Sequence, residues 1–399
     1  MAHILMLTPQ APFPPRQGTA LRNWGLLREL SRRHALSLLS FTAPDQSLTP
    51  PRELVAHVER VALFPQPERT LEKRLRQLVT SSRPDLALRL RDDAFAAHLN
   101  AWLTTHTFDW VLVEGLELAP YLDRVWSHPA SPRVAFDDHN CEYLLQKRAF
   151  LTDLQQPHRW IGAAYSWVQW RRLRRYEAGV CRRADLVIAV SRADAAALQR
   201  IAPRVEPLVL PNGIFVAEYA GFTGCAALET PAFVFTGTMD FRPNVDGVLW
   251  FAREVWPHLH AALPEAHAYI VGRRPHARLT SLRDTPGIVI TGSVPDTRPY
   301  INAATVYVVP LRVGGGTRFK ILEAAALRKP IVSTTLGAEG FPEAQEALTL
   351  ADEGRAFAAA CVRLAQDAAA RRQAAMRAFN FVAAYDWERL IPALSERLS

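Results

Sequence analysis

Short apolar runs alternate with stretches of helical periodicity along most of the chain. In the first half, residues 3–8 have the pattern of a short buried strand, and residues 19–34 carry apolar positions at helical spacing after a proline-rich loop at 9–18. Further buried strands are expected at residues 35–41, 110–113, 133–136, 186–190 and 208–210. After a weakly patterned segment at 215–231, a second series is expected at residues 233–235, 268–271, 288–291, 306–309 and 331–334.

The two series of strands predict two domains of the same class. Short apolar strands separated by amphipathic helices are typical of parallel sheets that carry helices on both faces. We therefore expect an α/β fold of two Rossmann-like, doubly wound domains, residues 1–213 and 214–378, that face a central cleft. In such domains ligands bind outside the carboxyl ends of the strands.

Composition narrows the class of protein. The 399 residues, 49% of them hydrophobic, suffice for two ordinary cores. A net charge of +8, carried almost entirely by arginine, favours anionic partners such as nucleotides or phospholipid headgroups. The sequence has no nucleic-acid-binding motif, so nucleic acid is not expected among the partners.

Cysteines and apolar runs bear on the compartment. The four cysteines lack Cys-x-x-Cys spacing, so neither a zinc site nor a disulfide framework is indicated, and a reducing cytoplasm fits. The opening residues, MAHILML, lack the basic segment and apolar length of a signal peptide. Because no run approaches the roughly 18 apolar residues of a membrane span, we expect a cytoplasmic protein, soluble or peripheral at the inner membrane face.

The segment from Val313 to Glu323 carries the most informative chemistry. It follows an expected strand and reads as a glycine loop that leads into a helix. Glycine lets a ligand approach the backbone without a Cβ in the way, and Thr317 is a suitable N-cap for the helix. The three consecutive glycines are Gly314, Gly315 and Gly316.

Two cations follow where a helix normally prefers acidic residues. Arg318 and Lys320 fall in the first turn, next to the positive end of the helix dipole. With the glycine backbone they predict a phosphate site, and Glu323, one turn further, could accept hydrogen bonds from a sugar hydroxyl. The alternative is that Lys320 and Glu323 form an exposed i,i+3 pair on a loop that needs glycine only for turning.

A set of motifs in a fixed order resembles the family 4 glycosyltransferases. In the second half these motifs are residues 237–244 (GTMDFRPN), 270–272 (IVG), 290–294 (ITGSV) and 314–323 (GGGTRFKILE). In the first half they are residues 12–18 (PFPPRQG), 137–140 (DDHN), 190–191 (VS) and 211–213 (PNG). The resemblance covers nearly the whole chain. It implies a B-type fold of two Rossmann-like domains, a nucleotide-diphosphate sugar bound mainly by the second domain, an acceptor bound by the first, and retention of anomeric configuration. Residues 379–399 would form a C-terminal helix that returns to the first domain.

The resemblance also assigns roles to individual residues. Glu323 would accept the hydroxyls of the donor ribose, and Arg318 and Lys320 would neutralise the diphosphate. Backbone groups at Gly237 and near Gly18 would assist them. The residues that would border the nucleobase are Gly272, Arg273 and Val294.

The chain departs from the family pattern in two places. The family's first signature glutamate, eight positions before the one that matches Glu323, is Gly315 here. The cations that members carry just after the first glycine of the second domain are missing too. We expect Arg242 to replace some of that charge, together with the two cations of the glycine loop. Asn244 could be the N-cap of the helix that follows.

His139 matches a histidine that the family places by the donor sugar and the leaving group. A single histidine is usually structural, but its position at the carboxyl end of a strand favours a catalytic role alongside Arg318 and Lys320. Asp137 and Asp138 precede it and are expected to line the cleft. No metal is implied, because the sequence lacks a convincing Asp-x-Asp metal site in the right context. No cofactor is implied either, because the nucleotide sugar is a co-substrate.

Residues 159–183 combine tryptophan with clustered arginine. Trp160, Trp167 and Trp170 accompany the run RRLRR at 171–175, a mix that suits an anionic membrane surface. The alternative is an ordinary helix that packs its tryptophans inward. Residues 73–91 are also basic and mainly helical.

These observations predict a retaining, metal-independent, hexosyltransferase-type glycosyltransferase. It would use a UDP, GDP or dTDP sugar and a glycan or lipid-linked acceptor, for a cell-surface polysaccharide or glycolipid. One alternative is a sugar-nucleotide epimerase of the same architecture. Another is a catalytically inactive nucleotide-sugar-binding subunit, which Gly315 in place of the first signature glutamate would favour.

Overall fold

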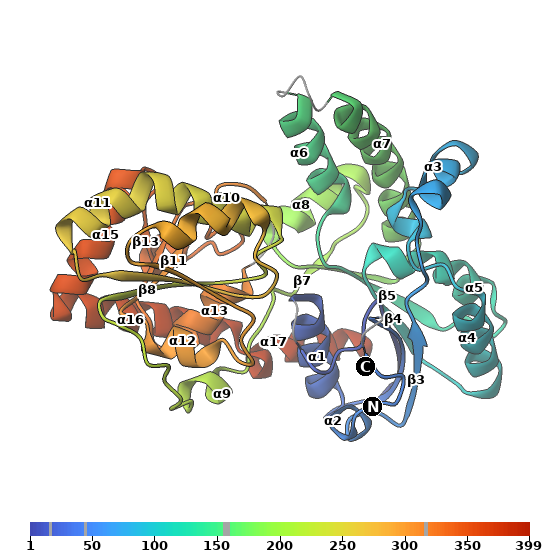
Figure 1. Ribbon diagram of the computed structural model, residues 1–399. Coiled ribbons are helices and arrows are strands. Elements are labelled where there is room, and N and C mark those ends of the chain that lie inside the picture. The colour runs from blue at the N-terminus through green and yellow to red at the C-terminus, as the bar shows by residue number, and fades with distance from the viewer. Residues whose placement is uncertain (16–17, 44–45, 155–159, 315–317) are drawn as a thin grey trace. The chain divides into compact units, whose positions relative to one another are not determined.

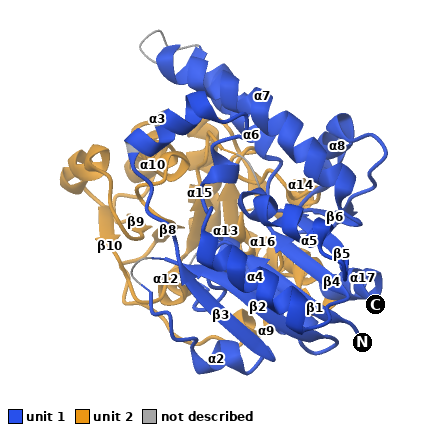
Figure 2. Ribbon diagram, turned by 90° about the vertical axis from the view of Figure 1, so that its right-hand side faces the viewer, with its two compact units in different colours: residues 1–211, 390–399 blue, residues 212–389 orange. Residues whose placement is uncertain are grey.

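A computed structural model describes residues 1–15, 18–43, 46–154, 160–314 and 318–399. The chain forms two compact units, one of residues 1–211 and 390–399 and the other of residues 212–389 (Figure 2). The expected boundary at 213 lies close to the observed one. The C-terminal segment that joins the first unit is shorter than the expected 379–399, because residues 379–389 belong to the second unit.

The first unit contains a parallel sheet that has seven strands among the described residues, in the order β3-β2-β1-β4-β5-β6-β7. Figure 1 labels β3, β4, β5 and β7 of this sheet. Its strands are β1 (His3–Thr8), β2 (Ala35–Thr42), β3 (Arg60–Pro65), β4 (Trp110–Glu114), β5 (Arg133–Asp138), β6 (Leu186–Ala189) and β7 (Leu208–Val209). In the central β1, Ile4 pairs with Leu36 on one side and Trp110 on the other. Strands β2 and β4 are buried along their whole length, as a parallel sheet covered on both faces requires.

Helices surround this sheet and complete the first unit. They are α1 (Gly18–Leu30), α2 (Arg52–Val55), α3 (Leu71–Thr80), α4 (Asp93–Thr105), α5 (Leu122–Ser127), α6 (Glu142–Leu154), α7 (Trp160–Arg183), α8 (Arg192–Ile201) and the end of α17 (Trp387–Leu398). Of these helices, α3 packs beside α7. Local sequence explains several starts: Asp92 accepts a hydrogen bond from Phe95 N at α4, and Ser191 accepts one from Asp194 N at α8. His34 and Ser395 hydrogen-bond at 2.8 Å and tie the end of the chain to this unit.

The second unit repeats the same topology. Its described residues form a parallel sheet of six strands in the order β10-β9-β8-β11-β12-β13. The strands are β8 (Ala232–Thr236), β9 (His267–Val271), β10 (Ile288–Gly292), β11 (Val306–Val309), β12 (Ile331–Ser333) and β13 (Thr349–Leu350). The surrounding helices include α9 (Val216–Ala220), α10 (Arg242–Trp250), α11 (Trp256–Ala262), α12 (Arg298–Ala303), α13 (Phe319–Ala326), α14 (Ala344–Ala347), α15 (Gly354–Gln366) and α16 (Ala368–Val382).

Strand order reverses at one place in each sheet. The reversal lies between β1 and β4 in the first unit and between β8 and β11 in the second. In open α/β sheets, ligands bind outside the carboxyl ends of the strands at this point. Ligand contacts are therefore expected at the loops after β8 and β11 in the second unit, and at the ends of β1 and β4 in the first unit, where β5 lies next to β4.

The hydrophobic pattern did not predict two of the strands, β3 and β13. β3 is an edge strand whose residues are mostly half-buried, so its apolar signal is weaker than that of the central strands. β13 has only two residues. All of the strands that were predicted are present, and their ends differ from the predicted ones by at most two residues. Among the helices of the described ranges, none is long and apolar enough to cross a membrane.

Candidate nucleotide-sugar site

Three glycine-bearing segments meet at the carboxyl end of the second sheet. Gly237 follows β8, Gly272 follows β9, and Gly314 precedes α13. A Cβ on Gly272 would stand 1.7 Å from the carbonyl oxygen of Gly237, so only glycine allows the two strand ends to approach this closely. A Cβ on Gly314, whose φ is +107°, would stand 3.0 Å from Nη2 of Arg318.

Lys320 lies beside Gly237 and is held by neutral groups. Its Nζ donates to Oδ1 of Asn244 at 3.0 Å and lies 4.1 Å from the ring centroid of Phe235. A Cβ on Gly237 would stand 3.1 Å from this Nζ, which means that the lysine points at bare backbone. Burial, followed by the nearby Arg318, lowers the pKa of Lys320 to about 7. A bound anion would offset that cost.

Asn244 has a different role from the expected N-cap. The cap of α10 is Phe241, and Asn244 lies inside the first turn, with its amide donating to Thr238 O at 2.9 Å. The same side chain accepts from Lys320, so it links the loop after β8 to the start of α13. Sequence reasoning missed this bridge because the partners are 76 residues apart.

Glu323 lies one turn into α13 from Lys320. Its Oε1 accepts a hydrogen bond from the hydroxyl of Tyr219 at 3.2 Å. Burial raises the pKa of Glu323, while the Tyr219 hydroxyl and the charge of Lys320 oppose that shift. Tyr219 comes from α9, in the segment that showed no clear sequence pattern, so only the structure reveals it. Its phenol orients the carboxylate and leaves Glu323 further acceptor capacity for a ligand hydroxyl.

The remaining residues predicted for the site lie on several different elements. Arg318 occupies the N-cap of α13, and Thr317, the expected cap, lies outside the described residues together with Gly315 and Gly316. Arg242 pairs with Asp246 at 3.6 Å along the surface of α10. The three other predicted residues lie after strand β9, after strand β10 and at the start of α1. Arg273 follows Gly272, with its carbonyl accepting from Met239 N at 2.8 Å; Val294 packs partly buried against the core of the second unit; and Gly18 is the first residue of α1.

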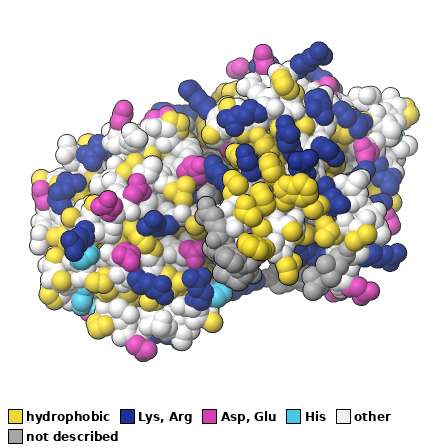
Figure 3. All heavy atoms as spheres, turned by 90° about the horizontal axis from the view of Figure 1, so that it is seen from above, with side chains coloured by type: hydrophobic (Ala, Val, Ile, Leu, Met, Phe, Trp, Pro, Cys, Tyr) yellow, Lys and Arg dark blue, Asp and Glu magenta, His cyan; other side chains and the backbone are white. Residues whose placement is uncertain are grey.

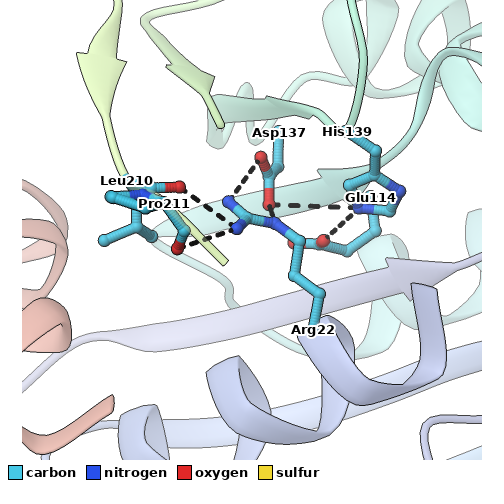
Figure 4. A network of polar contacts seen from close by, with 6 residues as sticks. All are labelled: Arg22, Glu114, Asp137, His139, Leu210 and Pro211. Carbon is cyan, nitrogen blue, oxygen red and sulfur yellow. Dashed lines mark hydrogen bonds and ion pairs between the residues drawn. The ribbon is translucent and has the colours of Figure 1, made fainter. Parts of the chain in front are cut away.

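His139 belongs to a polar network at the carboxyl ends of β4 and β5 in the first unit (Figure 4). Its Nε2 lies 2.7 Å from Oε2 of Glu114, the last residue of β4. Burial lowers the pKa of His139 and raises that of Glu114 well above its usual range, so both groups favour the neutral form. A carboxyl–imidazole hydrogen bond that holds one proton results, and it fixes the orientation of the imidazole ring.

Arg22 supplies the positive charge of this network. Its Nε and Nη2 bond the two oxygens of Asp137 at 2.7 and 2.9 Å, and the guanidinium is only 2% exposed. Its Nη1 also donates to the carbonyls of Leu210 and Pro211 at 3.1 and 3.3 Å. Arg22 therefore joins α1, the end of β5 and the segment after β7. The sequence placed it on the helix at 19–34 but offered no sign that it is buried.

The expectation that Asp137 and Asp138 line a cleft is wrong. Both are buried, at 0% and 1% exposure. Asp137 is the partner of Arg22, and Asp138 faces Glu177, whose two oxygens accept the backbone N–H groups of Glu142 and Tyr143 at 2.7 and 3.0 Å. The alternation of a β-strand directs the two side chains to opposite faces of the sheet, and helices cover both faces.

Two groups of three side chains among the described residues bring possible metal-ligand atoms within 4.8 Å of one another. They are Glu114, Asp137 and His139, and Asp138, Cys141 and Glu177. In the first group, Arg22 already neutralises Asp137 in a bidentate pair. In the second, Glu177 already caps the start of α6. These donors account for Asp137 and Glu177, whereas Asp138 accepts no hydrogen bond from the residues that the structure describes. We assign no ion to either group.

Comparison with known proteins connects this geometry to a family. Residues 17–218 match the model of Glycosyltransferase Family 4, and residues 230–367 match that of Glycosyl transferases group 1. A relative is the uncharacterized 44.6 kDa protein in the cps region of Klebsiella pneumoniae, 22% identical over 158 residues, which are 37% of this chain and 41% of that protein.

Solved structures share the architecture of the whole chain. Anabaena HepE in complex with UDP and glucose is 16% identical, with 100% of this chain and 99% of that chain covered and a TM-score of 0.64. WaaG, a glycosyltransferase involved in lipopolysaccharide biosynthesis, is 14% identical, with 100% and 99% covered and a TM-score of 0.63. The fold is thus the B-type glycosyltransferase fold, as expected, and with over half of its residues in the family match the chain belongs to glycosyltransferase family 4.

Proposed function

We propose that this glycosyltransferase moves a sugar, with retention of configuration and without a metal ion, from a nucleoside-diphosphate sugar to a cell-surface glycan or lipid-linked acceptor. The observation that carries the proposal is the pairing of Lys320 and Glu323 one helical turn apart. Both stand at the carboxyl end of the second sheet, where its strand order reverses.

Lys320 and Glu323 can divide the recognition of the donor between them. A lysine whose charged form is disfavoured by burial gains most when a diphosphate arrives, and Gly237 places backbone without a side chain next to its ammonium group. Glu323, held by Tyr219, can accept hydrogen bonds from ribose hydroxyls. Arg318, at the N-cap of α13, adds a second cation.

Transfer with these groups needs charge stabilisation more than covalent catalysis. The bond from the anomeric carbon to the diphosphate breaks, a bond to the acceptor oxygen forms on the same face, and the acceptor proton ends on a phosphate oxygen. Lys320, Arg318 and the N-terminus of α13 would stabilise the leaving diphosphate, which is the task that otherwise falls to a metal ion. Undiminished turnover in EDTA is the expected result.

His139 is our candidate for a group that acts on the transition state. Its ring is oriented by Glu114 and is kept neutral by burial, so it can offer a hydrogen bond without a full charge. Assignment of a catalytic role rests on its position at the end of β5 and on its match to the family motif.

The acceptor proposal draws on the relatives. The Klebsiella protein belongs to a cps region, and WaaG takes part in lipopolysaccharide biosynthesis. We propose a polysaccharide or glycolipid acceptor for this chain on that basis.

We also propose a cytoplasmic location, with which the four unpaired cysteines, three of them buried, are consistent.

A thermal-shift screen across UDP, GDP, dTDP and their sugars tests the donor class. A ligand at about 100 times its Kd adds ~2.7 kcal/mol to the stability of the folded state, which is readily measured. Donor turnover is then followed with and without acceptor extracts. Transfer to an acceptor supports the proposal. Isomerisation of donor alone would indicate an epimerase, and binding without turnover in any extract would indicate an inactive binding subunit.

A further inference from the structure

The hairpin of α6 and α7 exposes apolar side chains that the core of the first unit does not use. Trp160 is 62% exposed and Ile161 is 91% exposed at the start of α7. Trp167, two turns further on α7, and Leu151 and Leu154 at the end of α6 are exposed as well. The alternative of inward-packed tryptophans holds, among the three in this helix, for Trp170, which lies against the core.

Helical periodicity separates this exposed stripe from the packed face of α7. Ala163, Ser166, Gln169 and Leu173 are buried and dock the helix on its unit. The exposed positions follow the opposite face at intervals of three or four residues: Trp160, Ala164, Trp167, Arg171 and Arg174. The stripe therefore begins with large apolar groups and continues into arginines.

Cations surround the apolar part of the stripe. Within α7, the residues from 160 to 183 include six arginines and a single acidic residue, Glu177, which is buried. The neighbouring α3 is held against α7 by a hydrogen bond from Arg172 to Leu78 O at 2.9 Å. It adds exposed Lys73 and Arg76, together with Val79 at 86% exposure. Figure 3 shows hydrophobic side chains gathered on this face with Lys and Arg around them.

We propose that this face, formed by α3, the end of α6 and the exposed stripe of α7, docks on a bilayer that contains anionic lipid. Tryptophan has an apolar body and a polar N–H and is suited to the boundary between headgroups and acyl chains. Arginine reaches phosphate while its stem covers apolar surface. A charge-complementary occupant must be anionic outside and apolar inside, and a bilayer surface meets both conditions.

The docking surface is independent of the proposed transfer reaction, so it is tested by binding alone. The full chain is mixed with phosphatidylcholine vesicles and with vesicles that also contain phosphatidylglycerol, and the bound fraction is measured by flotation. We expect binding to the anionic vesicles only, reversed by high salt, with a blue shift of tryptophan emission.

Two sets of variants separate the electrostatic and apolar contributions. Arg171→Glu combined with Arg174→Glu and Arg175→Glu should weaken binding by roughly a hundredfold or more. Trp160→Ser with Ile161→Ser should weaken it roughly tenfold and abolish most of the blue shift. All five side chains are exposed, so circular dichroism should be unchanged.

The matched control carries the same kinds of change on α16 of the second unit. Arg372→Glu with Met376→Ser alters an exposed arginine and a methionine that is 64% exposed, and this variant should bind like the wild type. Equal loss in the control, or no preference of the wild type for anionic vesicles, would overturn the proposal. So would concentration-dependent dimers that Trp160→Ser dissolves, because the stripe would then be an interface between two copies.

Discussion

The two sheets share one topology, but the buried cations near their strand ends differ in how far neighbouring groups compensate the charge. In the first unit, Arg22 is buried and fully satisfied by a bidentate carboxylate and two backbone carbonyls. In the second, the Lys320 ammonium contacts an amide oxygen and an aromatic ring among the described residues, and burial disfavours its charged form although Glu323 lies nearby. Loss of one partner of a satisfied buried ion pair destabilises the fold, whereas an under-compensated buried charge is suited to a ligand.

The comparison predicts its largest effect at Arg22. Arg22→Ala leaves Asp137 as a buried carboxylate without its guanidinium, so the free energy of unfolding should fall by about 3 to 5 kcal/mol. Urea denaturation followed by circular dichroism measures the change. Arg33→Ala, at an exposed arginine just after the same helix, is the matched control and should shift stability little. If Arg22→Ala were as stable as this control, the network would not be a structural brace.

His139 tests whether the first unit also contributes to catalysis. We expect His139→Ala to retain the fold and to bind donor nearly normally, while kcat falls by ~100-fold or more, the range for loss of one electrostatic stabiliser. His139→Gln keeps a side chain that can hydrogen-bond to Glu114 but removes the imidazole. It therefore separates the effect of that hydrogen bond from the effect of the ring. Wild-type kcat in His139→Ala, or its failure to fold, would leave His139 a structural residue.

Glu323 tests the ligand side of the comparison. Glu323→Ala should leave the fold intact and weaken donor affinity at least tenfold, because hydrogen bonds to a charged group are worth ~1.5 to 3 kcal/mol. Isothermal calorimetry measures the donor affinity, and the variant Glu346→Ala, at an exposed glutamate, is the control. Tyr219→Phe removes the hydroxyl that holds the carboxylate and should have the same effect to a smaller degree. Unchanged affinity in Glu323→Ala would remove this residue from the site.

Lys320 should make diphosphate binding depend on pH. The anion binds the charged lysine, whose pKa in the free protein is lowered to about 7. Affinity for a nucleoside diphosphate should therefore fall by up to ~tenfold per pH unit above pH 7. In Lys320→Ala that slope should flatten and affinity should be lower, without loss of apo-protein stability, and Arg318→Ala should likewise impair diphosphate recognition. Variants that lose stability but keep full turnover would make both cations structural.

The buried carboxyl pair of Asp138 and Glu177 predicts the smallest effect. Burial raises the pKa of Glu177 to about 7 and that of Asp138 well above its usual range. The folded state then binds more protons than the unfolded state from about pH 4.5 to 7, so stability is lost as pH rises through that window. The expected slope is ~1.4 kcal/mol per pH unit for each extra proton that the folded pair holds. Asp138→Asn should flatten the denaturation midpoint against pH, and an unchanged profile would contradict the assignment.

Hydrophobic pattern located most of the architecture because buried parallel strands are nearly continuous apolar runs. The strands from β8 to β12 coincide with short apolar segments of the sequence, and Gly314 of the glycine run precedes α13. The pattern failed where burial is partial, as at β3, and at α9, whose Tyr219 contacts Glu323 across 104 residues.

By itself, the sequence determined two Rossmann-like domains, the candidate anion site around Lys320 and Glu323, and the mixture of tryptophan and arginine at 160–175. Only the tertiary structure decided that Arg22 braces Asp137, that Glu114 orients His139, that Asn244 holds Lys320, and that Trp160 faces solvent while Trp170 faces the core. The physical reason is that local propensity and period depend on neighbours in the chain. The partner and burial of a charged or aromatic side chain depend on segments that folding brings together from far apart.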